Sequence, residues 1–228
     1  MITIQGKGVS TGVALGPLYF YQRAKSTVTR YEVADTDAEW ARFKAAQEKA
    51  VEQLGELAEK ARAEAGDEAA MLFETHQMMA EDLDFEESIQ NAINENKLNA
   101  EAAVSDTAAQ FAEMFAAMDD AYFQARAADV KDVAGRILGI LTGAVAGGVD
   151  SPVPVILAAD DLAPSETVQL DKSKILGFIT EGGSGSWHRR FLERHERAGH
   201  LLFCGGAEKC DGKGRILQRS GAGSVEIF

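Results

Sequence analysis

The clearest candidate for covalent chemistry is His188, one of four histidines in the chain. It follows a glycine-rich loop, Gly182, Gly183, Ser184 and Gly185, which comes directly after an apolar segment. Such a loop before a helix supplies unpaired backbone N–H groups and a positive dipole end, which suit a phosphoryl group. Neutral imidazole is abundant near pH 7 and is a competent nucleophile. The pattern permits phosphoryl transfer to His188, although a loop of this kind is more often a plain connection.

Other chemistries fit this region less well. No Gly-Lys-Ser/Thr follows the loop, so it is not a Walker A motif. A Ser-His-Asp hydrolase would need a nucleophile elbow, which the sequence lacks. A zinc site would have to use residues whose spacing matches no common Cys/His pattern. Those residues are His188, His195, His200, Cys204 and Cys210.

A second candidate site surrounds His76, in a stretch from residue 63 to residue 96 that holds no Lys or Arg. Acidic residues crowd this stretch, and methionines and a phenylalanine stand among them. The acidic residues include Asp67, Glu68, Glu74, Glu81, Asp82, Asp84, Glu86 and Glu87, and the apolar ones Met71, Met78, Met79 and Phe85. Two interpretations stay open: a solvated acidic helix with a core stripe, or a docking surface for a basic partner.

Composition limits the class of protein. The 228 residues include 36 acidic and 23 basic side chains, for a formal charge of -13. This acidity argues against nucleic-acid binding, which needs a basic face. No apolar run approaches the roughly 20 residues of a membrane-spanning helix, and the first eight residues do not resemble a signal peptide. Two cysteines cannot make a disulfide framework, so we expect a cytoplasmic protein that does not insert into a membrane.

Changes in amino-acid composition divide the chain into three stretches, which must position these candidate site residues. Residues 1–30 alternate apolar and small residues with glycines, which indicates strands and turns. From about residue 35 to residue 143 the chain is rich in Ala, Glu, Gln and Leu and has no proline, which predicts helices. Beyond that, residues 153–157 and 175–179 are typical of buried strands, and residues 214–228 suggest a hairpin.

The middle stretch predicts four or five helices. Thr36 or Asp37 can cap a first helix that ends at Gly66. A second begins near Asp67 and breaks near residues 82–84, before a short helical segment. Later helices are expected from Asn99 or Ser105 and over residues 121–141. Short connections between such helices are typical of an antiparallel bundle.

We therefore expect two domains of different class. The fold class is α+β or α/β: a discontinuous α/β domain formed by residues 1–33 and 146–228, with a helical bundle of residues 34–145 inserted into it.

Several segments resemble one family in the same order along the chain. They are Phe73 to Met78, Arg126 to Asp132, Leu162 to Thr167, Gly177 to Gly183, and Gly8 to Ala14. Together they are similar to the N-terminal region of Enzyme I, the phosphoenolpyruvate-protein phosphotransferase of the bacterial phosphoenolpyruvate:sugar phosphotransferase system. The agreement runs from about residue 4 to residue 188, where His188 stands at the family's distance from the preceding strand.

The resemblance implies a kinase-like transferase in sugar uptake. Phosphoenolpyruvate phosphorylates the active-site histidine, which passes the phosphoryl group to the histidine-containing phosphocarrier protein, HPr. By position, His188 is the acceptor in a swivelling phosphohistidine domain, Thr167 orients its imidazole, and residues 182–185 form the phosphate loop. The helical bundle binds HPr. Its docking residues would be Asp67, Glu68, His76, Met78, Met79, Asp84 and Arg126.

Family members also carry a C-terminal barrel that binds phosphoenolpyruvate, Mg²⁺ and the dimer partner, and nothing in these 228 residues corresponds to it. We therefore expect this chain by itself to bind no cofactor or metal, to be a monomer, and at most to exchange phosphoryl groups with HPr.

The segment after the glycine-rich loop departs from the family. Trp187, Arg189 and Arg190 stand where the family has small residues. With permitted codons, a reading frame shifted by one base can convert Trp-His-Arg to Gly-Thr-Ala and can bring residues 194–200 close to the family's sequence. Our hypothesis is a frameshift over about residues 187–204, which the coding DNA would test.

Two alternatives remain. The chain could be a non-catalytic docking module that binds HPr through its acidic bundle and transfers nothing, because the active-site loop is damaged. The second alternative is a swivelling phosphohistidine domain like that of pyruvate phosphate dikinase. The motif with Phe73, Glu74 and His76 argues against it, because those relatives lack the inserted bundle.

Overall fold

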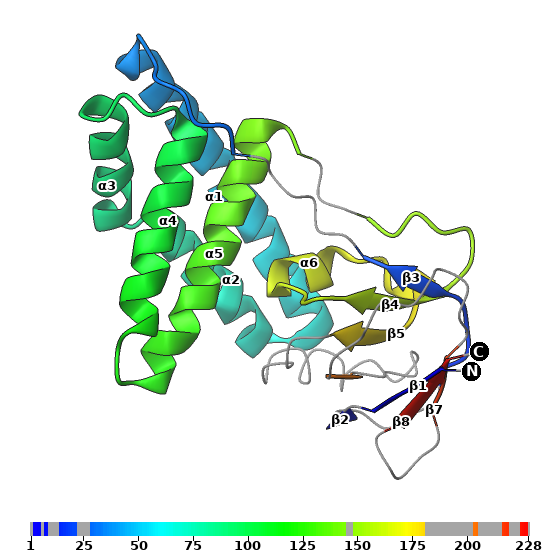
Figure 1. Ribbon diagram of the computed structural model, residues 1–228. Coiled ribbons are helices and arrows are strands. Elements are labelled where there is room, and N and C mark those ends of the chain that lie inside the picture. The colour runs from blue at the N-terminus through cyan, green and yellow to red at the C-terminus, as the bar shows by residue number, and fades with distance from the viewer. Residues whose placement is uncertain are drawn as a thin grey trace. The chain divides into compact units, whose positions relative to one another are not determined.

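The computed structural model describes residues 14–21, 28–144 and 148–180 in full, and five further strands by their backbone (Figure 1). The chain divides into two compact units. One consists of residues 1–23 and 147–228, and the other is the continuous stretch 24–146. We call them the α/β unit and the helical unit.

The α/β unit contains two sheets among its described strands. The larger has the order β2-β6-β5-β4-β3, in which β3 to β6 run parallel and β2 pairs antiparallel with β6. Its strands are β2 (Lys7–Gly8), β3 (Leu18–Phe20), β4 (Val155–Ala159), β5 (Ile175–Thr180) and β6 (Phe203–Cys204). The smaller, antiparallel sheet contains β1 (Ile2–Gln5), β8 (Ser224–Ile227) and β7 (Ile216–Gln218).

The strands expected from apolar runs are confirmed. β4 and β5 form within two residues of the expected segments, and β7 pairs with β8 as the expected hairpin. In β4, Val155, Ile156 and Leu157 are all buried in succession. A strand with both faces covered has no solvent side, which explains a continuous apolar run in place of alternation.

A short helix connects β4 to β5. This helix, α6 (Pro164–Gln169), precedes a 3₁₀ turn, η1 (Lys172–Lys174). Pro164 occupies the first helical position, where a missing N–H costs nothing. The Glu166 carboxylate accepts a hydrogen bond from the backbone N–H of Ala163 at 2.7 Å, which closes the first turn. The Pro-Ser-Glu-Thr motif thus forms a self-capped helix.

The helical unit has five helices among its described residues. They are α1 (Thr36–Ala65), α2 (Asp67–Ala80), α3 (Leu83–Asn94), α4 (Ala100–Ala116) and α5 (Ala121–Thr142). The expected stops and starts are confirmed at Gly66, whose φ is +87°, and at Asn99. The first cap is Asp35, one residue before the expected Thr36, because its side chain accepts a hydrogen bond from the N–H of Ala38 at 2.9 Å.

The core of the helical unit lies between α1, α2, α4 and α5, with α3 packed on α4 (Figure 1). Large side chains that are fully buried come from four of the five helices: Phe43, Leu54, Phe73, Ile89, Ile93 and Ile137. Alanines are also fully buried between the helices, as at Ala50, Ala61 and Ala70. Small residues let helix backbones approach, so the Ala-rich texture reflects tight packing. None of the described helices is long and apolar enough to cross a membrane.

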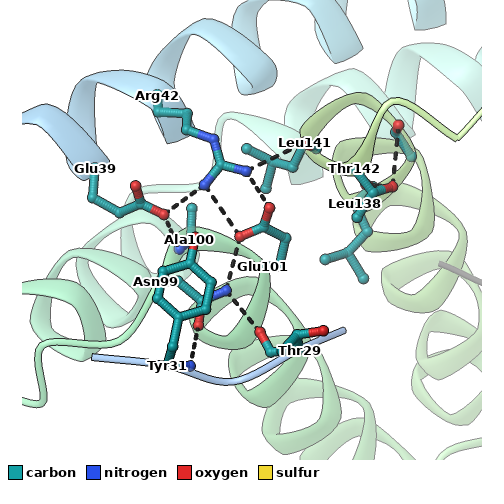
Figure 2. A network of polar contacts seen from close by, with 11 residues as sticks. Thr29, Tyr31, Glu39, Arg42, Asn99, Ala100, Glu101, Leu138, Leu141 and Thr142 are labelled. Atoms are coloured by element: carbon teal, nitrogen blue, oxygen red, sulfur yellow. Dashed lines mark hydrogen bonds and ion pairs between the residues drawn. The ribbon is translucent and has the colours of Figure 1, made fainter. Parts of the chain in front are cut away.

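The extended segment before α1 belongs to the helical unit. Val33 donates its N–H to the carbonyl of Lys97 at 2.8 Å, and Asn99 donates its N–H to the carbonyl of Tyr31 at 3.2 Å. The Asn99 side chain adds two bonds: its oxygen accepts from the N–H of Tyr31, and its amide donates to the carbonyl of Thr29 (Figure 2). These bonds attach residues 29–33 to the helical unit, which extends from residue 24 to residue 146.

A polar network continues from Asn99 into the helices (Figure 2). Glu101 accepts a hydrogen bond from the Asn99 amide at 2.8 Å and forms an ion pair with Arg42. The Arg42 guanidinium also donates to Glu39 at 2.7 Å and to the carbonyl of Leu141, near the end of α5, at 3.2 Å. The hydrogen bond to Glu101 raises the pKa of Arg42. One arginine therefore links α1, α4 and α5.

Candidate functional site

A groove opens in the helical unit where the end of α2 and the start of α3 meet α4 and α5. Its volume is about 170 Å³. The walls are mostly apolar, and two acidic residues belong to the lining. The lining residues are Met79, Asp82, Asp84, Phe85, Phe111, Met114, Phe115, Val130 and Val133. We call this feature the groove.

The turn between α2 and α3 forms the opening of the groove. α2 ends at Ala80, and Asp82 then caps α3 by accepting a hydrogen bond from the N–H of Phe85 at 2.9 Å. This turn directs the buried Phe85 against Phe111 of α4, edge to face, with ring centroids 5.5 Å apart. The aromatic pair forms a rigid floor between α3 and α4.

Apolar side chains near the groove are open to solvent. Met78 is 73% exposed and Leu83 is 78% exposed. Met114, which lines the groove on α4, is 48% exposed. Side chains this open contribute little to a core, so their apolar character is available to a binding partner.

The charged side chains that line the groove are both acidic. Lys97 is the only Lys or Arg between residues 63 and 125, a stretch that includes all of α2, α3 and α4. Asp82 and Asp84 are exposed and line the groove. An apolar groove with an acidic rim is complementary to an apolar patch surrounded by basic residues.

The structure brings some of the predicted docking residues together. Met79 and Asp84 line the groove, and Met78 is exposed next to Met79 on α2. Asp67 and Glu68 are exposed in the first turn of α2, at the opposite end of that helix. Asp67 there accepts a hydrogen bond from Nε of Arg62 at 3.2 Å.

Arg126 of α5 is half-buried and held from two sides. Its Nη1 donates to Oδ2 of Asp129 at 2.9 Å, and its Nη2 donates to the hydroxyl of Tyr122 at 2.6 Å. The guanidinium also lies over the Tyr122 ring, 4.6 Å from the centroid. Burial alone lowers the pKa of Arg126, but the bonds to Tyr122 and Asp129 outweigh it and raise that pKa. The guanidinium thus remains a fixed cation.

His76 is not on the surface. Its side chain is fully buried, with the ring edge-on to Phe73 at 5.9 Å between centroids. Nε2 lies 3.3 Å from Oδ1 of Asp129, and Nδ1 lies 3.8 Å from Oδ2 of Asp132. Neither ring nitrogen has a hydrogen bond of good geometry among the described residues. A partner cannot touch this side chain directly, so any part in docking is indirect.

The predicted phosphoryl-transfer residues are described only in part. His188 and the loop residues 182–185 lie outside the described residues. Thr167 is buried in α6, and its hydroxyl donates to the carbonyl of Ala163 at 3.0 Å. Because the hydroxyl proton is engaged, the oxygen can serve only as an acceptor toward another group. In the described part of the chain, no three His, Cys, Asp or Glu side chains form a metal-sized cluster.

Known proteins resemble this chain along most of its length. Residues 5–126 match the family described as PEP-utilising enzyme, N-terminal. The chain belongs to this family. A phosphoenolpyruvate-protein phosphotransferase of Priestia megaterium is 36% identical over 195 residues, which are 84% of this chain and 34% of that protein. One of Lactococcus lactis is 34% identical over 225 residues, 96% of this chain and 38% of that protein.

Solved structures of the same family share the fold. The NMR solution structure of an Enzyme I protein, nEIt, is 29% identical, with a TM-score of 0.77 over 98% of this chain and 92% of that one. The resemblance to the N-terminal region of Enzyme I, predicted from sequence motifs, is therefore confirmed. This chain spans about a third of the length of the curated relatives that it matches.

The residues of α4 and α5 that line the groove were not identified from the sequence as parts of a site. Phe111, Met114 and Phe115 follow one another at spacings that fit one face of α4, and Val130 and Val133 lie three residues apart on α5. Spacings of three and four residues indicate a face without revealing whether another helix covers it. The high exposure of Met114 is a property of the tertiary structure.

Proposed function

We propose that the chain is the N-terminal part of an Enzyme I, in which phosphoenolpyruvate phosphorylates a histidine that passes the phosphoryl group to HPr. Family membership and relatives named phosphoenolpyruvate-protein phosphotransferase support this assignment. In this proposal the α/β unit is the discontinuous phosphohistidine domain, and the helical unit is the inserted HPr-binding bundle. The protein works in the cytoplasm, in sugar uptake.

The groove is the observation that carries the docking half of the proposal. An apolar anchor of the partner would enter between Phe85, Met79 and Phe115, where binding energy is concentrated because water is excluded. Basic residues around that anchor would face Asp82 and Asp84. We therefore propose an HPr surface with an exposed apolar side chain ringed by Lys or Arg. Arg126, a cation in these acidic surroundings, would fix the orientation of HPr by binding an acceptor.

The transfer half rests on His188 and Thr167. A ring nitrogen of His188 attacks phosphorus while the nitrogen–phosphorus bond to the HPr histidine breaks, and the reverse step restores it. The other ring nitrogen carries a proton that needs an acceptor to hold the imidazole in place. Thr167 supports this role, because its hydroxyl already donates within α6 and its oxygen can accept that N–H.

A docking module without transfer is the second candidate. The observation that favours it is the replacement of small family residues by Trp187, Arg189 and Arg190 beside His188. Phosphoryl transfer depends on positioning, and a shift on the order of 1 Å can cost about a hundredfold in rate. Under this proposal HPr binds the groove, but no phosphoryl group reaches the chain.

The experiment is intact-mass measurement after incubation with phosphorylated HPr, with His188→Ala as the matched variant. One acid-labile phosphate adduct that vanishes in the variant supports transfer through His188. No adduct, with HPr binding still measurable by calorimetric titration, supports the docking module. If HPr neither binds nor transfers, both forms of the proposed function are wrong.

A further inference from the structure

We propose that His76 is a positioning residue, which acts on partner binding through Asp129 and Arg126. The geometry is independent of the identity of the partner, whereas the effect on binding rests on the proposed docking function. The helical unit buries His76 completely, yet its ring reaches a carboxylate that also holds a surface cation. A buried side chain can thereby set the orientation of a side chain at the surface.

The carboxylate of Asp129 is shared between two cationic or N–H-bearing groups. Oδ1 faces Nε2 of His76 at 3.3 Å, and Oδ2 accepts from Nη1 of Arg126 at 2.9 Å. The side chain of Asp129 is only 15% exposed, so water does little to replace either contact. A carboxylate with a hydrogen bond at one oxygen and an imidazole packed against the other has little freedom to turn, and it transmits its orientation to the guanidinium.

The opposite side of the imidazole explains why it stays in place. Asp132, one turn further along α5, lies 3.8 Å from Nδ1, and Phe73 packs edge-on against the ring. The charged groups around the imidazole in these contacts are thus two α5 carboxylates, with Arg126 beyond the first. The contacts with Asp129, Asp132 and Phe73 surround the buried ring and restrict its rotation.

Both ends of this chain of contacts belong to helices that line the groove. His76 precedes Met79 by three residues on α2. Arg126 precedes Val130 by four residues on α5, a spacing that places the two on the same face. A partner seated in the groove therefore meets Arg126 at its edge, with a direction set from beneath by Asp129.

The competing explanation is that His76 only stabilises the core. A double-mutant cycle on HPr affinity separates the two. His76→Leu removes both ring nitrogens, and we expect it to weaken HPr binding by about 3- to 20-fold, which lies within the range of coupled neighbouring residues. In the Arg126→Ala background the same change should alter affinity less than about twofold, because no guanidinium remains to be positioned.

His76→Gln is the conservative variant, since its side-chain amide keeps an N–H near the position of Nε2. We expect it to recover most of the affinity lost in His76→Leu, and it keeps the test valid if the leucine variant does not fold. Ile137→Val is the control for stability alone, because Ile137 is fully buried on α5 and takes no part in these contacts. It should lower stability and leave HPr affinity unchanged.

A second measurement needs no partner. The guanidinium N–H signals of Arg126 report its rotation, and in the same NMR spectrum Arg42, bound by Glu101, is the internal control. We expect faster rotation of Arg126, with Arg42 unchanged, in His76→Leu. Additive effects of His76 and Arg126 substitutions, or an unchanged Arg126 signal, would overturn the proposal. Failure of the wild type to bind HPr would instead overturn the proposed function and leave the NMR test intact.

Discussion

Arg42 and Glu101, 59 positions apart in the chain, meet in a two-point ion pair at one end of the helical unit (Figure 2). Glu101 is almost fully buried, and its second bond comes from Asn99, which fixes the backbone of Thr29 and Tyr31. The segment that leads into α1 is thus attached to the same carboxylate as α1 itself.

Replacing Glu101 by Ala should lower the free energy of unfolding by about 1–3 kcal/mol, because it leaves Arg42 and Asn99 without their shared acceptor. Urea denaturation measures the loss, and amide exchange at Tyr31 should accelerate. Asp106→Asn is the control: its pair with Arg30 is exposed, so we expect a cost below about 1 kcal/mol. Equal losses in the two variants would contradict a structural role for the network.

Acid should destabilise the helical unit through two glutamates. Burial raises the pKa of Glu101 and of Glu86, but hydrogen bonds from Arg42 and Asn99, and from Lys44 and Gln47, outweigh it and lower both pKa values. The stability they contribute is present above their pKa in the unfolded chain and is lost as pH falls through the folded pKa. As pH falls through these pKa values, the free energy of unfolding should decrease less steeply in Glu101→Gln than in the wild type. An unchanged slope would argue against the pair.

Met78→Ala should weaken HPr binding by about fivefold or more while changing stability by less than about 0.5 kcal/mol, because the side chain is largely exposed. Calorimetric titration measures the affinity. Val153→Ala, which shortens a half-exposed apolar side chain in the α/β unit, is the matched control. Loss of affinity in the control alone would place the docking surface elsewhere.

Asp84→Asn should weaken HPr binding at low salt by about two- to fivefold and flatten its dependence on ionic strength, since it removes one charge from the rim of the groove. Titrations at several salt concentrations test this. Asp37→Asn makes the same charge change in the first turn of α1 and should leave the salt slope nearly unchanged. Identical slopes in both variants would mean that only net charge matters.

Thr167→Val keeps the shape of the side chain but removes its oxygen, so phosphoryl exchange with phosphorylated HPr should slow by on the order of ten- to a hundredfold. Thr167→Ser should restore most of the rate. Single-turnover mass measurement follows the reaction. Full activity in the valine variant would show that the imidazole is oriented by another group.

Much of the helical unit is predictable because its boundaries depend on local signals. Gly66 ends α1 with a positive φ, Asp82 caps α3 with its side chain, and Asn99 occupies the N-cap position of α4. The first cap was misplaced by one because Asp35, Thr36 and Asp37 are all good capping residues, and the choice among them depends on a single hydrogen bond.

The polar contacts were less predictable, for a physical reason. Nothing local links Arg42 to Glu101, because the ion pair exists only after α1 and α4 pack. His76 is a different case. Its spacing from Phe73 and Ala80, three and four residues, is that of one helix face, and both neighbours are fully buried. That spacing favours burial, whereas the acidic residues around His76 favour a surface position.

The polar network around Glu101 predicts how the helical unit behaves when it is separated from the rest of the protein. Thr29 near its entry and Leu141 near its exit are bound, through Asn99 and Arg42, to one carboxylate, Glu101. A segment whose two ends are held together by its own contacts does not need the rest of the protein to bring those ends together. Residues 28–144 should therefore behave as a transplantable cassette that folds when excised, tolerates circular permutation within residues 117–120, and can be grafted into a loop of an unrelated host.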